Sequence, residues 1–293
     1  MSSVDDLTAR LQRMAERAQQ RQRERTPKPT PKPAPVVRLP LWPAELRTCP
    51  SCVLRSALFG VVRRGKRSYL ERQIIATWAN TTIRYTGMRL DQADLDVWLT
   101  ALHITRESGL GAPVRTSIRI MLKAMGRTLD GRAYEDFNNT IVRLTGCVVE
   151  ITVNRKTYGG SLIESFERHE DTGDYVLYLN PKLVVLFEDN AFALIDWEQR
   201  HGLRRDLSKW LHGYILSHKA TAQEPHRIGL EKLRDLCGSE TGGLWKFRQQ
   251  IREAMAELQE ASIVTRWKIT SGDALELVRP QRKRRIIEDG GSG

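Results

Sequence analysis

Two cysteines, Cys49 and Cys52, have the spacing that many metal and redox sites use. A structural zinc site needs four ligands, usually two such pairs or one pair with two histidines. No second pair exists, because Cys147 begins an apolar strand-like run and Cys237 ends a helix-like run. The Pro-rich flank of the first pair also lacks the strand and helix of a redox motif. We therefore expect no metal, and Cys147 and Cys237 are predicted to be small core residues.

Catalytic groups are equally sparse in the sequence. Nucleases, relaxases and primases need clustered carboxylates or histidines for metal ions, or a tyrosine paired with a His-rich motif. The six histidines are scattered, and His212 and His218 have no matching set of acids. No phosphate-binding Gly-x-x-x-x-Gly-Lys-Ser/Thr motif is present. The sequence thus predicts a protein without catalytic activity and without a cofactor.

The side chains with the clearest chemistry are Lys, Arg and Gln residues on a predicted helix at 243–260. Apolar residues that recur at helical spacing and would bury one face are Leu244, Phe247, Ile251, Met255 and Leu258. The residues pointing away from this face are Trp245, Lys246, Gln249, Arg252 and Glu253. Arg248 lies beside the buried face, where its long stem could still reach outward. Because Lys and Arg bond phosphates and guanine, and Gln bonds adenine, this helix is predicted to contact DNA.

An ordinary solvated face is the alternative for this helix. It is weakened because cationic and amide side chains fill the first turns, whereas Glu253, Glu257 and Glu260 come later. The formal net charge of +12 also favours a polyanionic partner, and nucleic acid is the commonest one.

The elements around this helix follow an order that occurs twice. In the second half we expect helices near 203–218, 230–236 and 243–260, then strands at 263–269 and 274–278. In the first half we expect helices near 91–104, 114–125 and 132–144, then strands at 147–153, 161–167 and 175–179. Three helices followed by a β-ribbon is the winged-helix order, whose third helix lies in a major groove about 12 Å wide. We therefore predict an α+β fold with two tandem winged-helix domains.

The first half supplies further candidates for DNA contact. On its third helix, Arg132, Asn139 and Arg143 could touch phosphates or bases, with a mainly structural helix or a dimer contact as an equal alternative. Arg155 and Lys156 lie in a basic turn that would suit a wing on the DNA backbone. An ordinary solvated turn explains these two residues as well.

The remaining segments divide the chain into four parts. Residues 1–38 are predicted to be a basic extension, helical or disordered, with a Pro-rich linker. The two domains would cover 39–190 and 191–280, and 281–293 would be a basic tail whose Gly-Gly-Ser-Gly end is typical of an expression-vector remnant. No apolar run approaches the ~18–20 residues that span a bilayer, so we expect no membrane segment and a cytoplasmic protein.

Short segments spread over residues 42–278 carry a family resemblance. They are Arg55–Phe59 (RSALF), Ile83–Gly87 (IRYTG), Asp96–Trp98 (DVW), Gly131–Tyr134 (GRAY), Val184–Phe187 (VVLF), Trp197–Glu198, Ser217–His218, Cys237–Ser239 (CGS) and Lys246–Gln250 (KFRQQ). Each is short, but their order and spacing resemble the TrfA-type plasmid replication initiators, within the wider group of iteron-binding Rep proteins.

The resemblance implies a function. Such a protein would bind directly repeated duplex sites at an origin, help to open an adjacent A·T-rich region, and recruit a host initiator and a replicative helicase. Monomers would be active and dimers inactive. The resemblance places Lys246, Arg248 and Gln250 in the recognition helix. Whether single-stranded A·T-rich DNA is also bound is left open.

Two points limit what the resemblance implies. The family's known member has a Gln-Leu-x-Leu-Phe-like peptide that engages the sliding clamp. This chain has Pro-Ala-Pro-Val-Val at the aligned place, and the nearby Arg38–Trp42 (RLPLW) lacks the Gln, which makes clamp binding doubtful. The residues also allow a winged-helix transcriptional regulator or autorepressor. Loss of autonomous replication on deletion of the gene would favour the initiator, and a change only in transcript level would favour the regulator.

Overall fold

The computed structural model of the chain describes residues 36–62, 67–78 and 80–280, together with residues 14, 16 and 17. The chain divides into two compact units, 1–35 and 36–293, and only the second is described below. The predictions of an N-terminal helix and linker, apart from those three residues, and of a basic tail fall outside the described residues.

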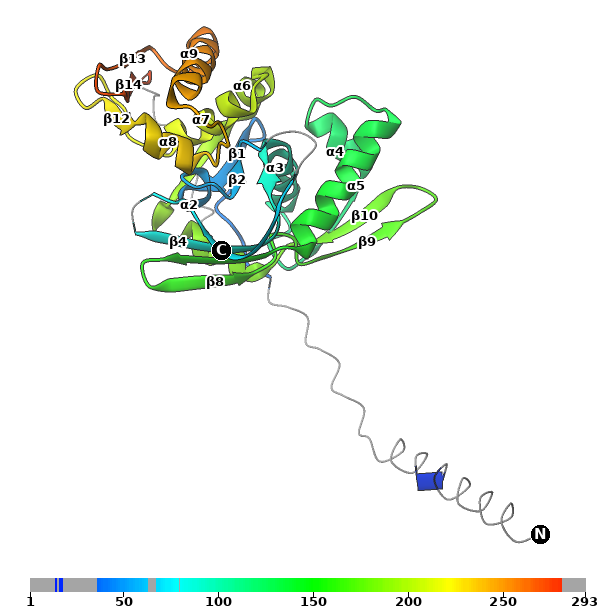
Figure 1. Ribbon diagram of the computed structural model, residues 1–293. Helices are drawn as coiled ribbons and strands as arrows, with labels where there is room; N and C mark the ends of the chain where they lie inside the picture. The colour runs from blue at the N-terminus through cyan, green and yellow to red at the C-terminus, as the bar shows by residue number, and fades with distance from the viewer. Residues whose placement is uncertain (1–13, 15, 18–35, 63–66, 79, 281–293) are drawn as a thin grey trace, which may run out of the picture. The chain divides into compact units, whose positions relative to one another are not determined.

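Two hydrophobic clusters divide the larger unit into a first and a second half. The helices and strands of both halves are labelled in Figure 1. The first cluster ends at Trp197 and the second begins at Leu203. Strand β11 (Phe192–Asp196) stays with the first half because it pairs antiparallel with β1 (Leu46–Pro50). The boundary between the two clusters therefore lies between Trp197 and Leu203, whereas the sequence analysis placed the domain boundary after residue 190.

The first half is built on a central helix, α3 (Gln92–Thr105). Asp91 caps its start, since the Asp91 carboxylate accepts from the backbone N–H groups of Ala93 and Asp94 while the Asp94 side chain accepts from the N–H of Asp91. Apolar side chains that recur at helical spacing along α3 are buried, namely Leu95, Trp98, Leu99 and Leu102. The other helices of this half are α2 (Ser51–Leu54), α4 (Ile118–Ala124), α5 (Gly131–Gly146) and the 3-10 helix η1 (Pro181–Asn190).

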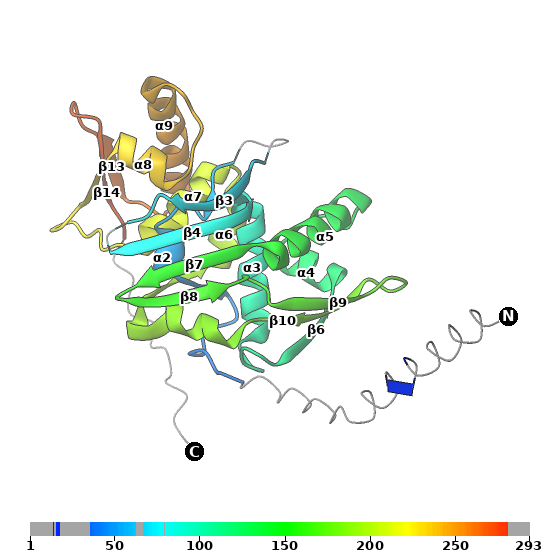
Figure 2. The same ribbon diagram turned by 60° about the horizontal axis from the view of Figure 1, so that its bottom comes forward.

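A four-stranded antiparallel sheet covers one side of α3 (Figure 2). Its strands, in spatial order, are β3 (Tyr69–Ile75), β4 (Thr81–Met88), β7 (Val148–Val153) and β8 (Lys156–Gly160). The side chains of Ile83, Tyr85, Val149 and Ile151 alternate along β4 and β7 and are buried in the first cluster. A short parallel pair, β2 (Phe59–Gly60) with β5 (Leu90–Asp91), leads into α3.

A second sheet of the first half corrects two sequence predictions. Strand β6 (Pro113–Ser117) replaces the first turn of the helix expected from residue 114, because it pairs with β10 (Asp174–Tyr178), which in turn pairs with β9 (Ser165–His169). The β-ribbon that pairs with β6 is therefore β9–β10, the second hairpin after α5. The hairpin β7–β8, expected to be that ribbon, belongs to the four-stranded sheet instead.

The second half contains the three predicted helices and both predicted strands. Helix α6 (Trp197–Gly202), whose Trp197 belongs to the first cluster, leads into this half. The elements of the second half are α7 (Asp206–Leu216), β12 (His226–Gly229), α8 (Leu230–Leu236), α9 (Leu244–Glu260), β13 (Arg266–Ile269) and β14 (Ala274–Val278). The sequence did not predict the four-residue β12, which completes an antiparallel sheet in the order β12-β14-β13. None of the helices in the described ranges is long and apolar enough to cross a membrane.

Candidate nucleic-acid interface

Helix α9 buries the face that its periodicity predicts. Phe247, Ile251, Met255 and Leu258 are fully buried, and Ala254 joins them. Leu244 is only half-buried at the helix start. Because this face packs into the second cluster, the rotation of the helix is fixed, and so is the direction of every other side chain on it.

The opposite side of α9 is open to solvent near its N-terminus. Trp245 is 69% exposed, and Lys246, Gln249 and Arg252 are also exposed. Within the described part of the chain, neither Lys246 nor Arg252 forms an ion pair, whereas the Gln249 amide donates weakly to Glu253 at 3.4 Å. Two cations with no acidic partner among the described residues therefore lie about one and two-thirds turns apart on the solvent-exposed part of the helix.

Arg248, which was predicted to contact DNA, is bonded to an acidic side chain of the protein itself. Its guanidinium bonds both carboxylate oxygens of Asp273, with Nε–Oδ1 at 2.9 Å and a terminal nitrogen 2.5 and 2.6 Å from Oδ1 and Oδ2. Asp273 lies in the turn between β13 and β14 and has a positive φ of 53°. Arg248 thus joins the helix to this turn. Gln250, also placed in the recognition helix by resemblance, is half-buried and accepts from the Thr241 hydroxyl at 2.9 Å.

On α5, the three predicted residues separate into two kinds. Arg132 and Asn139 are exposed. Arg143 is largely covered and donates to Oδ1 of Asp94 at 2.7 Å, where the Asp94 side chain is fully buried. The same guanidinium donates to the Thr140 hydroxyl at 2.8 Å. Arg143 therefore attaches α5 to α3, and this contact was beyond sequence reasoning because the partners lie 49 residues apart.

Arg155 and Lys156 lie at the exposed end of the β7–β8 hairpin. Asn154 and Arg155 both have positive φ, the pattern of a tight two-residue hairpin turn. Lys156 forms an ion pair with Glu188 of η1. These two residues are accessible, but they lie on the four-stranded sheet and not on the ribbon that joins β6.

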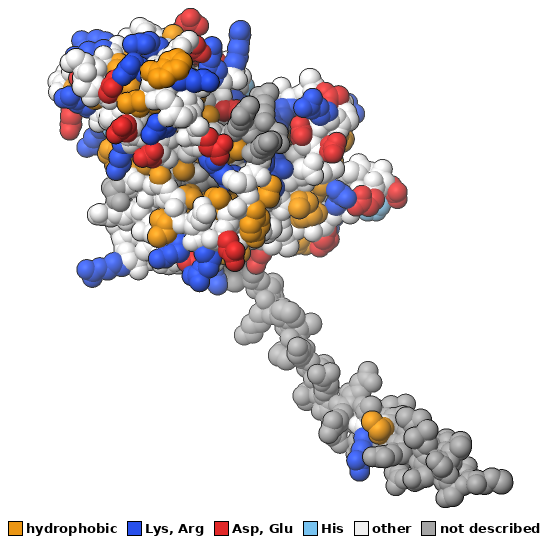
Figure 3. Space-filling model, viewed as in Figure 1, with side chains coloured by type: hydrophobic (Ala, Val, Ile, Leu, Met, Phe, Trp, Pro, Cys, Tyr) orange, Lys and Arg blue, Asp and Glu red, His pale blue; other side chains and the backbone are white. Residues whose placement is uncertain are grey.

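Two depressions connect the outward sides of α5 and α9. One, of about 770 Å³, is lined by Arg132 and Arg143 of α5, and the other, of about 710 Å³, by Lys246 of α9. Arg204 and Asp206, at the start of α7, line both. Lys and Arg side chains are exposed over α9 and over the far end of α4 and α5, with acidic groups between them (Figure 3). A single polyanion could therefore reach both helices.

The sequence analysis missed several basic residues at these depressions. Arg204 is exposed and Arg205 pairs with Glu253 at 3.3 Å. Arg67 and Arg127 line the depression beside α5, although Arg67 is engaged by the acids that cap α3. The adjacent Arg204 and Arg205 were the available signal, since two consecutive cations lie in the first turn of the helix predicted near 203–218.

The cysteine pair lies in the first half, with Cys49 buried and Cys52 partly buried. Burial raises the pKa of Cys49 well above its usual value and that of Cys52 to about 11, so both are protonated thiols at neutral pH. All four cysteines are free. In the part of the chain that the structure describes, no three His, Cys, Asp or Glu side chains are grouped as metal ligands would be.

Comparison with known proteins assigns the family. The model of the TrfA protein family matches residues 34–276. The chain belongs to the TrfA family. It is 28% identical over 233 residues to the plasmid replication initiator protein TrfA of Escherichia coli, an alignment that covers 76% of this chain and 59% of that protein.

Two solved structures are similar to this chain at low sequence identity. Domains 2 and 3 of RctB share 11% identity and a TM-score of 0.55, covering 79% of this chain and 98% of that one. The Pi initiator protein, solved in complex with iteron DNA, shares 12% identity and a TM-score of 0.48 over 64% of this chain and 92% of that one. The chain thus has the mixed α/β fold of the RctB domains.

Proposed function

We propose that this chain is a plasmid replication initiator that binds repeated duplex DNA sites, or iterons, at an origin. The observation that carries the proposal is the outward side of α9, where Lys246 and Arg252 are exposed and have no acidic partner in the described structure. Cationic side chains near the N-terminus of an exposed helix are the groups that bond phosphates and guanine edges. Membership of the TrfA family supports the choice of origin DNA as the ligand.

The proposed architecture is two tandem winged helices. In the second half, α7, β12, α8, α9 and the β13–β14 ribbon follow the order of that motif. In the first half, α3, β6, α4, α5 and the β9–β10 ribbon follow the same order, with β7–β8 as an insertion. In both, a three-stranded sheet places the early strand beside the ribbon, which supports the view that α5 and α9 are equivalent third helices.

The rest of the proposal depends on family membership. We propose that the protein helps to open an A·T-rich region, recruits a host initiator and a replicative helicase, and is controlled by a monomer–dimer equilibrium. It would act in the bacterial cytoplasm, on DNA, without catalysis, metal or cofactor. The chain spans 59% of the length of its TrfA relative, so these activities of the whole relative are proposals for this chain.

Selection from random duplexes, followed by sequencing, tests DNA recognition directly. Enrichment of one repeated motif supports the proposal, and recovery of unrelated sequences argues against it. Affinity for the selected site should also fall steeply with salt, because Lys and Arg displace counterions from phosphates. A flat dependence between low and moderate salt would exclude a DNA backbone as the ligand.

Replication is tested with a plasmid that carries the gene and its origin. Deletion of the gene should abolish autonomous replication, and supplying it in trans should restore it. A change in transcript level without loss of replication would favour the transcriptional regulator. Robust metal-dependent nicking of supercoiled origin DNA would overturn the non-catalytic assignment.

A further inference from the structure

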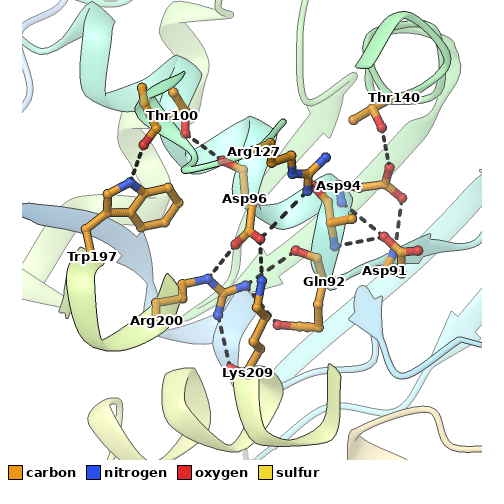
Figure 4. A network of polar contacts seen from close by, with 12 residues as sticks. Asp91, Gln92, Asp94, Asp96, Thr100, Arg127, Thr140, Trp197, Arg200 and Lys209 are labelled. Atoms are coloured by element: carbon orange, nitrogen blue, oxygen red, sulfur yellow. Dashed lines mark hydrogen bonds and ion pairs between the residues drawn. The ribbon is translucent and has the colours of Figure 1, made fainter. Parts of the chain in front are cut away.

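A buried polar cluster joins the two halves of the protein (Figure 4). It consists of Gln92 and Asp96 on α3, Arg200 on α6 and Lys209 on α7, and is called the bridge below. Arg200 is completely buried and Asp96 is 2% exposed. In a buried position each of these charges needs a partner, so the contacts among them are obligatory.

Each polar group of Arg200 in the bridge has a partner at short distance. Its Nε donates to Oδ1 of Asp96 at 2.6 Å, and its two terminal nitrogens donate to the Gln92 side-chain oxygen at 3.0 Å and to the Lys209 carbonyl at 3.0 Å. The Lys209 ammonium donates to the other Asp96 oxygen at 2.9 Å. Burial alone would raise the pKa of Asp96, but Arg200 and Lys209 lower it to about 2, so the carboxylate is charged.

Stabilising the interface between the two halves does not by itself explain why this bridge is polar. The halves already meet closely elsewhere, since a Cβ added to Gly213 of α7 would lie 2.7 Å from the Leu54 side chain, and the Trp210 indole donates to the Ser56 carbonyl at 3.1 Å. Apolar residues of similar volume usually match or exceed the stability of a buried ion pair. The hydrogen bonds and ion pairs of the bridge are directional, so, unlike apolar contacts, they define one orientation of the two halves relative to each other.

The bridge lies between the two helices that face DNA in the proposed function. On one side, α3 holds α5 through the pair Asp94–Arg143 at 2.7 Å. On the other side, α7 holds α9, because the Ser208 hydroxyl donates to Glu257 at 2.5 Å. Polar contacts therefore run from α5 through α3, the bridge and α7 to α9, with Asp94 and Asp96 only two residues apart on one helix.

We infer that the bridge sets the relative placement of α5 and α9, and that it thereby fixes the number of base pairs between their contacts on a duplex. This inference rests on the proposed DNA binding. One added base pair moves the far contact by about 3.4 Å and by about a tenth of a turn, so a rigid pair of helices cannot follow it. Gln92, Asp96 and Arg200 are then positioning residues for spacing specificity that are buried away from DNA, and Lys209, which also lines the depression beside α5, shares that role.

The experiment uses the full chain and its selected duplex. Footprinting defines the two contacted groove segments, and one or two base pairs are inserted between them. The wild type should lose about tenfold or more in affinity on a single insertion, because all contacts of the first half, and not those of one or two side chains, are displaced together. In Asp96→Asn with Arg200→Met, we expect weaker binding to the selected site and a penalty for the insertion below about threefold.

Controls separate spacing from stability. Val149→Ala creates a cavity in the four-stranded sheet away from the bridge, so it should lower the melting temperature yet keep the full insertion penalty. A folded double variant that keeps the wild-type penalty overturns the inference. If that variant does not fold, Lys209→Met decides instead, because it retains the Asp96–Arg200 pair and loses one bond. An unchanged penalty in Lys209→Met then overturns it.

Two wild-type results separate this inference from the proposed function. If the wild type binds no specific duplex, the proposed function itself fails. If it binds its site but tolerates insertions without loss, DNA binding stands and the spacing role of the bridge is wrong.

Discussion

Helices α5 and α9 hold the same place in the order of the two halves, yet their outward sides differ. On α9, Lys246 and Arg252 are exposed and unpaired within the described structure. On α5, Arg143 is engaged by Asp94, and the exposed residues near Arg132 include acidic ones. Both helices bury an apolar face, so they differ in whether their cationic side chains are paired with acids of the protein.

This difference indicates a division of labour. Arg143 cannot reach a base without giving up its bonds to the buried Asp94 carboxylate, which would then keep only Arg67 as an ionic partner. The free cations of α9 carry no such cost. We therefore expect α9 to supply sequence recognition, while α5 positions the first half and contributes at most phosphate contacts.

The largest expected effect is on α9. Lys246→Ala with Arg252→Ala should lower affinity for the selected site about 100-fold or more, since each good base contact is worth about 1–3 kcal/mol. Arg132→Ala with Asn139→Ala on α5 should cost only a few-fold. Titrations at fixed salt measure both.

A charge-matched control is needed for this comparison. Arg115→Ala with Lys182→Ala removes two exposed cations elsewhere and should leave specific binding nearly unchanged. Equal losses for the α9 and α5 variants would break the division of labour. Retained site-specific footprints in the α9 variant would remove that helix from recognition.

The next effect is on stability and belongs to α5. Arg143→Ala leaves the buried Asp94 with Arg67 as its ionic partner, so the free energy of unfolding should fall by about 2 kcal/mol, the value of a lost hydrogen bond to a charged group. Arg132→Ala, on the same helix but exposed, should change it by less than about 0.5 kcal/mol. Denaturant unfolding compares them. A neutral Arg143→Ala that loses DNA binding would restore Arg143 as a direct contact.

The sequence predicted the features that depend on local pattern. The 3.6-residue period of α9 identified its buried face, and the three helices of the second half were predicted close to their observed positions. Features that depend on partners far away in the sequence were not predicted. Strands β6 and β12 have only five and four residues, and their partners β10 and β14 come much later in the chain.

The roles of paired arginines escaped prediction for the same reason. Periodicity gives the side of a helix on which a residue lies, but it does not give the acid that will face that side. Arg143 and Arg248 look like free cations in the sequence, and only the fold brings Asp94 and Asp273 to them. The bridge around Arg200 was likewise invisible, because its partners Gln92 and Asp96 lie more than 100 residues away.

A smaller effect is expected at the turn held by Arg248. Asp273→Asn keeps a residue that tolerates positive φ but removes the charge, and should cost about 1 kcal/mol of stability because the pair is partly exposed. If Arg248 only holds the turn, Asp273→Asn and Arg248→Ala should lower DNA affinity by the same factor. A much larger loss for Arg248→Ala would mean that Arg248 also contacts DNA, which would bring it closer to Lys246 in role.

The smallest expected effect separates phosphate contact from base contact on α5. Arg132→Ala should weaken binding a few-fold and equally for all sequences, and should reduce the slope of log affinity against log salt by about 0.9, the value for one phosphate. For Lys246→Ala, the loss of affinity should instead depend on which base occupies one position of the site. Measuring both variants on the selected site and on single-base substitutions of it distinguishes the two roles. If Arg132→Ala relaxes the preference at one base while leaving the salt slope unchanged, then α5 reads sequence as α9 does, and the asymmetry between the two halves lies only in how their arginines are paired.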